Sequence, residues 1–169
     1  MIPVCTSARK YTSNSLTRYN LPDSKFFERG DIFMAEKLVV IIQCEDVVKR
    51  CSGFLCMRDF YDKAGKFSGY PENLRYMSIT CGGCCGNLLT PKLENLGMRL
   101  RKDGLSKDDV VIHFATCVCS DNSHRLPCPF LNRMKALLNR KGFTNIVLGT
   151  HISKKAQEKR DAGIYKNWE

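Results

Sequence analysis

Short apolar runs rich in β-branched residues recur along the chain and predict four β-strands. The runs are Leu38–Gln43, Leu74–Thr80, Val110–Ala115 and Asn145–Thr150. Between them, apolar residues at helical spacing predict three helices. Their positions are Val47, Cys51, Phe54, Leu55 and Arg58 in the first, Leu89, Leu93, Leu96 and Leu100 in the second, and Phe130, Met134, Leu137 and Leu138 in the third. This alternation predicts a single α/β domain with a mostly parallel sheet of four strands or slightly more, helices on both faces and a Rossmann-like three-layer arrangement.

We expect this domain to occupy residues 34–152. Residues 1–33 are rich in Ser, Thr and Asn and show no sustained period, so we expect a poorly packed N-terminal extension. Residues 153–169 form a charged C-terminal tail in this interpretation, and residues 60–71 form a loop-like insert with Gly65 and Gly69.

Composition and charge restrict the class of protein. The 169 residues are 43% hydrophobic and 26% charged, which is typical of a globular chain. The net charge of +10 divides into +2, +6 and +2 over residues 1–33, 34–152 and 153–169, so it is spread along the chain and does not favour a nucleic-acid partner. No apolar run reaches the roughly 20 residues of a membrane span, and no secretory signal pattern follows Arg9 and Lys10. We therefore expect a cytoplasmic protein without a membrane partner, whose thiols are reduced.

Soft metal-binding side chains follow each predicted strand where it ends. They are Cys44 after the first strand, Cys81, Cys84 and Cys85 after the second, Cys117 and Cys119 after the third, and His151 after the fourth. The carboxyl ends of parallel strands share one edge of a sheet, and ligands bind in the crevice outside it. Three more cysteines can fold back toward this edge, namely Cys51, Cys56 and Cys128. Nine of the ten cysteines would then converge, with Cys5 as the exception.

Two explanations of these cysteines compete. Cysteine is a small apolar residue that is often buried in cores, but core packing would scatter cysteines through the strands, and the predicted strand interiors contain none. The pattern therefore favours a shared metal or redox site. The motif Cys81-Gly82-Gly83-Cys84 lets two thiolates reach one ion or form one disulfide, so it fits either a metal half-site or a redox pair.

The cysteine-bearing segments together resemble the CGGC-domain family. They are Cys44, Cys51-Ser-Gly-Phe-Leu-Cys56, Cys81-Gly-Gly-Cys84, Cys117, Cys128-Pro129 and Gly149-Thr150-His151. The resemblance implies a metal-binding, zinc-containing domain of prokaryotic proteins with no established reaction. Two positions depart from the family pattern, since Cys85 stands where that family usually has proline and Cys119 is an addition.

The candidate metal ligands number eight, enough for two tetrahedral sites or for one site and several reactive thiols. They are Cys44, Cys51, Cys56, Cys81, Cys84, Cys117, Cys128 and His151. We expect zinc, with an iron–sulfur cluster as the alternative, although the ferredoxin cysteine spacing is absent. The structural, sensing or catalytic role of the metal stays open. The other class of function is a thiol–disulfide redox enzyme in which Cys81 attacks and Cys84 resolves.

The remaining histidines are weaker candidates. His113 lies inside the third predicted strand, so we expect a hydrogen-bonded core histidine, and His124 lies in a polar loop, where we expect exposure. Glu45 and Asp46 are the carboxylates nearest the edge that could act as a general base.

Overall fold

The fold is described from a computed structural model over residues 38–122 and 124–166. The predicted N-terminal extension and Cys5 lie outside these residues. The elements in chain order are β1 (Leu38–Gln43), α1 (Glu45–Val48), α2 (Phe54–Tyr61), the 3-10 turn η1 (Gly65–Phe67), β2 (Arg75–Thr80), the 3-10 turn η2 (Cys84–Gly86), α3 (Leu89–Lys102), β3 (Val110–Phe114), α4 (Thr116–Cys119), α5 (Leu131–Arg140), β4 (Ile146–Leu148) and α6 (Lys154–Asp161).

The four predicted strands form one sheet with the order β2-β1-β3-β4. Each neighbouring pair is parallel, with Ile42 of β1 opposite Ile79 of β2 and Phe114 of β3. The prediction of a parallel α/β sheet is therefore confirmed. In this register the strands present their carboxyl ends along one edge, as the placement of the site residues requires.

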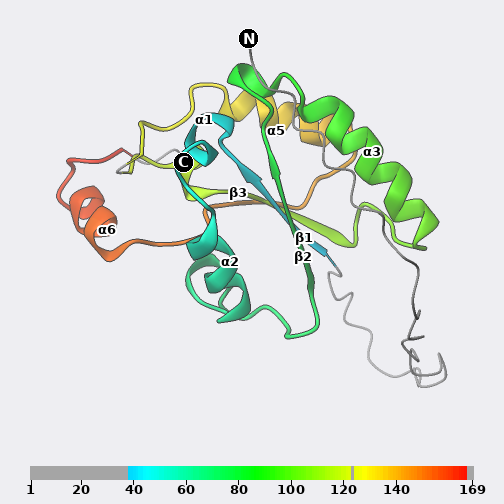
Figure 1. The fold of residues 1–169 in the computed structure, drawn as a ribbon, viewed down its shortest axis with the longest axis horizontal. Helices are drawn as coiled ribbons and strands as arrows, with labels where there is room; N and C mark the ends of the chain where they lie inside the picture. The colour runs from blue at the N-terminus through cyan, green and yellow to red at the C-terminus, as the bar shows by residue number, and fades with distance from the viewer. Residues whose placement is uncertain (1–37, 123, 167–169) are drawn as a thin grey trace, which may run out of the picture. The chain divides into compact units, whose positions relative to one another are not determined.

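Alternate residues of β1 pack on opposite faces of the sheet, as the period of a strand dictates. Val40 and Ile42 join the apolar cluster that includes α3 and α5, whereas Val39 and Ile41 join Phe60 and other residues on the opposite face. Figure 1 shows α3 and α5 on one side of the sheet and α2 on the other. The three-layer prediction is confirmed, and every described residue of β1 except Gln43 is buried.

The first predicted helix is wrong in its extent, because the chain forms two short helices there. Gly53 precedes α2 with a φ of +74°, a left-handed conformation that interrupts the helical path begun in α1. The face that the sequence pattern assigned to the core is also wrong, since Phe54 and Leu55 are exposed. Phe60 is buried instead, and so is Asp59 beside it.

The segment predicted as a loop-like insert contributes to the core. Phe67 of η1 is fully buried and stacks edge-on against Phe60, with their ring centroids 5.6 Å apart. The C-terminal tail contains α6, whose N-terminus is capped by the Ser153 hydroxyl. Within the described residues, no helix combines the length and apolar character that crossing a membrane requires.

Candidate metal centre

The carboxyl edge of the sheet carries the predicted donors in a regular arrangement. Cys44 and Cys81 directly follow β1 and β2, whereas Cys117 and His151 lie three residues beyond the ends of β3 and β4. Seven of the eight candidates form two adjoining groups, which meet where Cys44 lies near Cys117. The cavity group consists of Cys51, Cys56, Cys117 and His151, and the Arg125 group consists of Cys44, Cys81 and Cys128.

The cavity group lines one hollow of about 200 Å³ between α2, α4 and the chain that follows β4. All four members border this space, together with His124 and Arg160. The loop after α1 supplies Cys51, α2 supplies Cys56 and α4 supplies Cys117. Three thiols and an imidazole from four separate segments thus face the same volume.

Burial disfavours ionisation of two cavity thiols, Cys56 and Cys117, because it raises the pKa of each. It raises the pKa of Cys117 from 9.0 to about 12, with further increases from the nearby sulfurs of Cys56, Cys44 and Cys51. Burial also raises the pKa of Cys56, although hydrogen bonds from the Thr150 side chain and the His151 backbone lower it. The thiolate forms of Cys56 and Cys117 are therefore disfavoured by desolvation and by neighbouring sulfurs, two effects that a bound cation would oppose.

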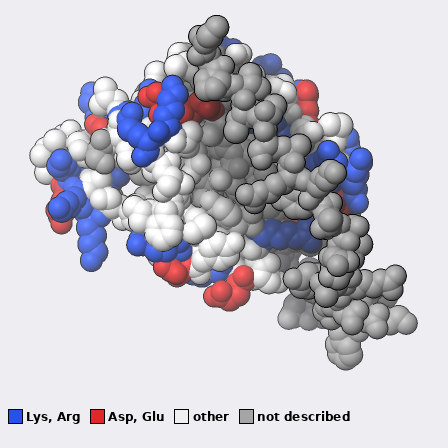
Figure 2. All heavy atoms as spheres, in the orientation of Figure 1, with Lys and Arg blue, Asp and Glu red and all other residues white. Residues whose placement is uncertain are grey.

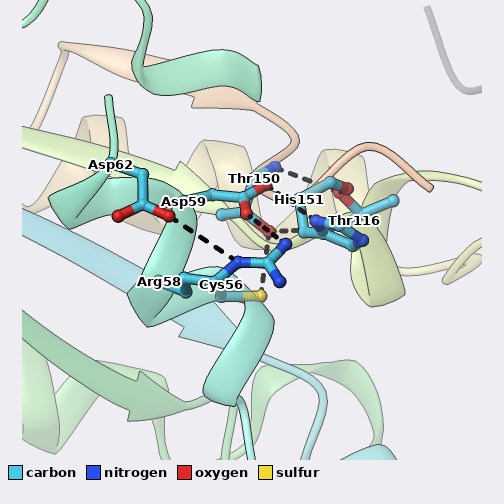
Figure 3. A network of polar contacts seen from close by, with 7 residues as sticks. All are labelled: Cys56, Arg58, Asp59, Asp62, Thr116, Thr150 and His151. Carbon is cyan, nitrogen blue, oxygen red and sulfur yellow. Dashed lines mark hydrogen bonds and ion pairs between the residues drawn. The ribbon is translucent and has the colours of Figure 1, made fainter. Parts of the chain in front are cut away.

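A rigid polar frame fixes the backbone beside this cavity (Figure 3). The hydroxyl of Thr116 donates to the His151 carbonyl at 2.8 Å and accepts from the Thr150 amide at 3.1 Å. The Thr150 hydroxyl accepts from the Thr116 amide and lies 3.2 Å from Sγ of Cys56. These contacts join α4 to the chain after β4 and place Cys56 next to His151.

Asp59 is a site residue that sequence analysis missed. Its carboxylate Oδ2 lies 2.7 Å from Nδ1 of His151, and its side chain is buried. The available signal was spacing, because Cys56 and Asp59 are three residues apart and so share one face of a helix. Of the two carboxylates proposed from the sequence, Asp46 does not share this buried position. It is exposed and pairs with Lys49 at 3.5 Å.

The Arg125 group lies on the side of the edge that adjoins α3 and α5. Nη1 of Arg125 donates to Sγ of Cys44 at 3.1 Å, and this bond raises the pKa of Arg125. The backbone amide of Glu45 donates to Sγ of Cys81 at 3.4 Å. Burial raises the pKa of Cys128, while Arg125 lowers it and the sulfurs of Cys81 and Cys44 raise it. Cys44 and Cys81 also belong to the apolar core on this face.

The CGGC loop presents its two cysteines differently. Cys81 is 7% exposed, whereas Cys84 is exposed. Gly82 has a φ of +75°, and a Cβ there would lie 2.3 Å from Cβ and 2.9 Å from Cα of Leu88. Gly83 also has a positive φ, but a Cβ there would meet no atom within 4 Å. The first glycine is therefore needed for close packing of the chain, and the second only for its backbone conformation.

The other histidines follow the sequence predictions. His113 is fully buried and donates from Nδ1 to the Gly149 carbonyl at 2.8 Å, while Nε2 accepts from the Tyr70 hydroxyl at 2.9 Å. Burial lowers the pKa of His113, in agreement with a neutral core histidine. His124 is exposed, as predicted.

The two additional cysteines of the edge do not join either group. Cys119 is buried and its thiol donates to the Phe114 carbonyl at 3.6 Å. Cys85 adopts a φ of +62° within η2. Such a conformation is not open to proline, the residue expected here from the family pattern, because the proline ring fixes φ near −65°.

The donors fit zinc by their chemistry rather than by their present arrangement. Among the residues that the structure describes, no three or more His, Cys, Asp or Glu side chains are positioned to hold a metal ion. The cavity group nevertheless has the composition of a Cys₃His zinc site, and its imidazole has Nδ1 occupied by a carboxylate. The chemistry of these donors therefore fits zinc, although their side chains do not surround an ion position in this arrangement.

The surface charge agrees with the even distribution found in the sequence. On the face shown in Figure 2, Lys and Arg side chains occur in separate places and alternate with acidic and uncharged ones. A continuous basic band, which a nucleic-acid backbone would require, is not seen among the described atoms of this face.

Comparison with known proteins identifies the family. The model of the CGGC domain matches residues 38–151, which is more than half of the chain and includes β1 through His151. Searches against curated proteins and against solved structures gave no match. The matched segment contains all the cysteines of the cavity group and of the Arg125 group. The chain therefore belongs to the CGGC-domain family, as the resemblance of its cysteine-bearing segments predicted.

Proposed function

We propose that this protein binds one zinc ion through Cys51, Cys56, Cys117 and His151. The observation that carries the proposal is that these four residues line one cavity of about 200 Å³. Soft thiolates and a neutral imidazole are the ligands that zinc prefers, and three cysteines with one histidine are a common structural set. The chain belongs to the cysteine-rich CGGC-domain family, and its resemblance to that family implies metal binding, which agrees with this choice.

The electrostatics of the cavity support a cation there. A thiol such as Cys117, whose pKa burial raises to about 12, does not ionise at neutral pH without a compensating charge. A zinc ion supplies that charge, and each thiol that binds it releases a proton. When bound, the metal would join α2, α4 and the chain after β4, so we propose a structural or sensing role.

The choice between zinc and an iron–sulfur cluster depends on the ligand set. Clusters are generally held by four thiolates, whereas the cavity group contains three cysteines and one histidine. The first measurement is therefore elemental analysis and acid-labile sulfide on protein purified without oxygen. We expect about one zinc per chain without sulfide, whereas iron with equimolar sulfide would contradict the zinc assignment.

A pair of cysteine variants locates the site. Cys51→Ser removes a donor of the cavity group, and Cys128→Ser removes a partly buried cysteine of the Arg125 group. We expect Cys51→Ser to lose zinc and Cys128→Ser to retain it. Loss of zinc from Cys128→Ser alone would move the site to the Arg125 group, and a wild-type protein without metal would contradict the proposed function.

A second function, thiol–disulfide exchange at Cys81 and Cys84, is favoured by the exposure of one of these two thiols. Because Cys84 is exposed and Cys81 is 7% exposed, the structure favours Cys84 as the attacking thiol and Cys81 as the resolving one, the reverse of the order expected from the sequence. Alkylation followed by peptide mass mapping tests this function. Exchange activity that is lost in Cys84→Ser while zinc binding persists would show that the protein has both properties.

A further inference from the structure

The imidazole of His151 is held by a carboxylate that the interior of the domain encloses. Asp59 is 4% exposed, and its Oδ2 lies 2.7 Å from Nδ1 of His151. Its other oxygen accepts from Nη2 of Arg58 at 3.2 Å. Figure 3 shows the carboxylate between the Arg58 guanidinium and the imidazole. Burying a carboxylate costs free energy unless charged or hydrogen-bonded partners compensate, so Asp59 is tied to these two side chains.

This contact determines which ring nitrogen of His151 remains available. An ionised carboxylate only accepts hydrogen bonds, so the proton in this contact is on Nδ1 and Nε2 is the ring nitrogen left for a metal ion. Within the described chain, no hydrogen bond occupies Nε2. His151 also borders the cavity that contains the thiols of Cys51, Cys56 and Cys117.

The backbone of His151 is fixed independently of its side chain. The Thr116 hydroxyl holds its carbonyl at 2.8 Å, and Thr150, the preceding residue, is fully buried. With the backbone fixed, the remaining freedom of the imidazole is rotation about its side-chain bonds. The hydrogen bond to Asp59 restricts that rotation, because turning the ring away from α2 would leave a buried carboxylate without one of its partners.

We infer that Asp59 is a positioning residue that holds His151 with Nε2 as its metal-binding nitrogen. The inference rests on the proposed zinc site and adds a residue that is not itself a ligand. Metal-bound histidines commonly donate their second ring N–H to a carboxylate, which fixes the tautomer and increases the basicity of the ligating nitrogen. Cys56 and Asp59 then act from one face of α2, the first as a ligand and the second through His151.

The test compares two carboxylates of the same helical segment. Asp62 lies three residues after Asp59, is exposed, and pairs only with Arg58 at 3.8 Å among the described residues. Zinc affinity is measured by competition with a chromophoric chelator for the wild type, Asp59→Ala, Asp59→Asn and Asp62→Ala. We expect Asp59→Ala to bind zinc about 10-fold to 100-fold more weakly. Asp59→Asn should recover part of the loss because its amide oxygen still accepts from Nδ1, and Asp62→Ala should match the wild type.

A spectroscopic measurement on the wild type keeps the inference testable if Asp59→Ala does not fold. In ¹⁵N NMR spectra of the ring, the zinc-free protein should show the Nδ1–H tautomer of His151, and zinc should shift the Nε2 resonance. Zinc binding through Nδ1, or equal affinities of Asp59→Ala and Asp62→Ala, would overturn the inference while leaving zinc binding intact. A wild type that takes up no zinc would instead overturn the proposed function, and the role of Asp59 with it.

Discussion

The raised pKa of Cys117 predicts a loss of stability at alkaline pH. In the folded, metal-free chain this thiol has a pKa of about 12, against 9.0 for an ordinary cysteine. Between these values the unfolded chain loses the Cys117 proton while the folded chain keeps it. The contribution of this thiol is therefore fully present below about pH 9 and decreases as the pH rises toward 12.

The magnitude follows from the difference in bound protons. Each pH unit between the two pKa values costs about 1.4 kcal/mol. At about pH 10.5, the wild type should therefore have lost about 2 kcal/mol through Cys117 alone. Cys117→Ser replaces the thiol with a hydroxyl that does not titrate in this range, so this loss should be missing from the variant.

The assay is urea denaturation of both proteins with a chelator and a reductant, at pH 8 and at pH 10.5. Titration of lysines, tyrosines and the other cysteines affects both proteins, so the comparison isolates position 117. We expect the free energy of unfolding to fall by about 2 kcal/mol more in the wild type than in Cys117→Ser. An equal fall in both proteins would refute the buried, protonated state that we assign to this thiol.

Four further substitutions test other parts of the structure by urea denaturation. Tyr70→Phe removes the hydroxyl that donates to buried Nε2 of His113 and should cost about 1–3 kcal/mol, whereas a neutral effect would contradict the hydrogen-bonded core histidine. Gly83→Ala should cost about 1–3 kcal/mol, because Gly83 has a φ of +100° and a ψ of 178°, a region essentially restricted to glycine. Gly82→Ala should cost more because its Cβ also meets backbone atoms of Leu88, so equal costs would disprove the packing of the CGGC loop. Phe67→Ala should cost about 3–5 kcal/mol, and a loss below 1 kcal/mol would show that this segment is outside the core.

The sequence predicted the two central strands, β1 and β3, well because they are buried in the middle of the sheet. Such strands appear as continuous apolar runs, and the predicted run Leu38–Gln43 coincides with β1. The second predicted helix also matches, since Leu89, Leu93 and Leu96 are all buried in α3. In both cases the local pattern and the tertiary packing require the same residues to face inward.

The first helical segment failed for a physical reason. Helical spacing continues through residues 47–58, but Gly53 adopts a left-handed conformation, and no periodicity reveals a φ of +74°. Phe54 and Leu55 therefore fit the apolar pattern of the sequence but are exposed in the structure. The role of Asp59 was missed for a similar reason. A buried carboxylate is recognised from its partner, and the partner of Asp59, His151, is 92 residues away in the sequence.

The convergence of cysteines could be predicted, but their division into two groups could not. Strand ends place Cys44, Cys81 and Cys117 along one edge regardless of which way each side chain turns. The side of the edge on which a thiol lies depends on the loop after its strand. Cys81 accepts from the Glu45 amide and belongs to the core beneath α3, whereas Cys117 packs against the apolar clusters on both faces and also borders the cavity beside α2. Loop conformation of this kind is decided by tertiary contacts.

The net charge of the proposed zinc site would favour a nearby cation, and Arg160 is a candidate that is not itself a ligand. Zinc with three thiolates and a neutral imidazole carries a net charge of −1, which is costly to bury without a partner. Arg160 of α6 borders the same cavity, and its Nε is buried without a hydrogen-bond partner in the described structure. Its Nη1 donates to Oε1 of Gln157 at 3.1 Å, and we expect its guanidinium to offset part of that charge when the ion is bound. Metal binding would then connect the helix of the C-terminal tail, which lies beyond the matched family segment, to the cysteines of the CGGC domain.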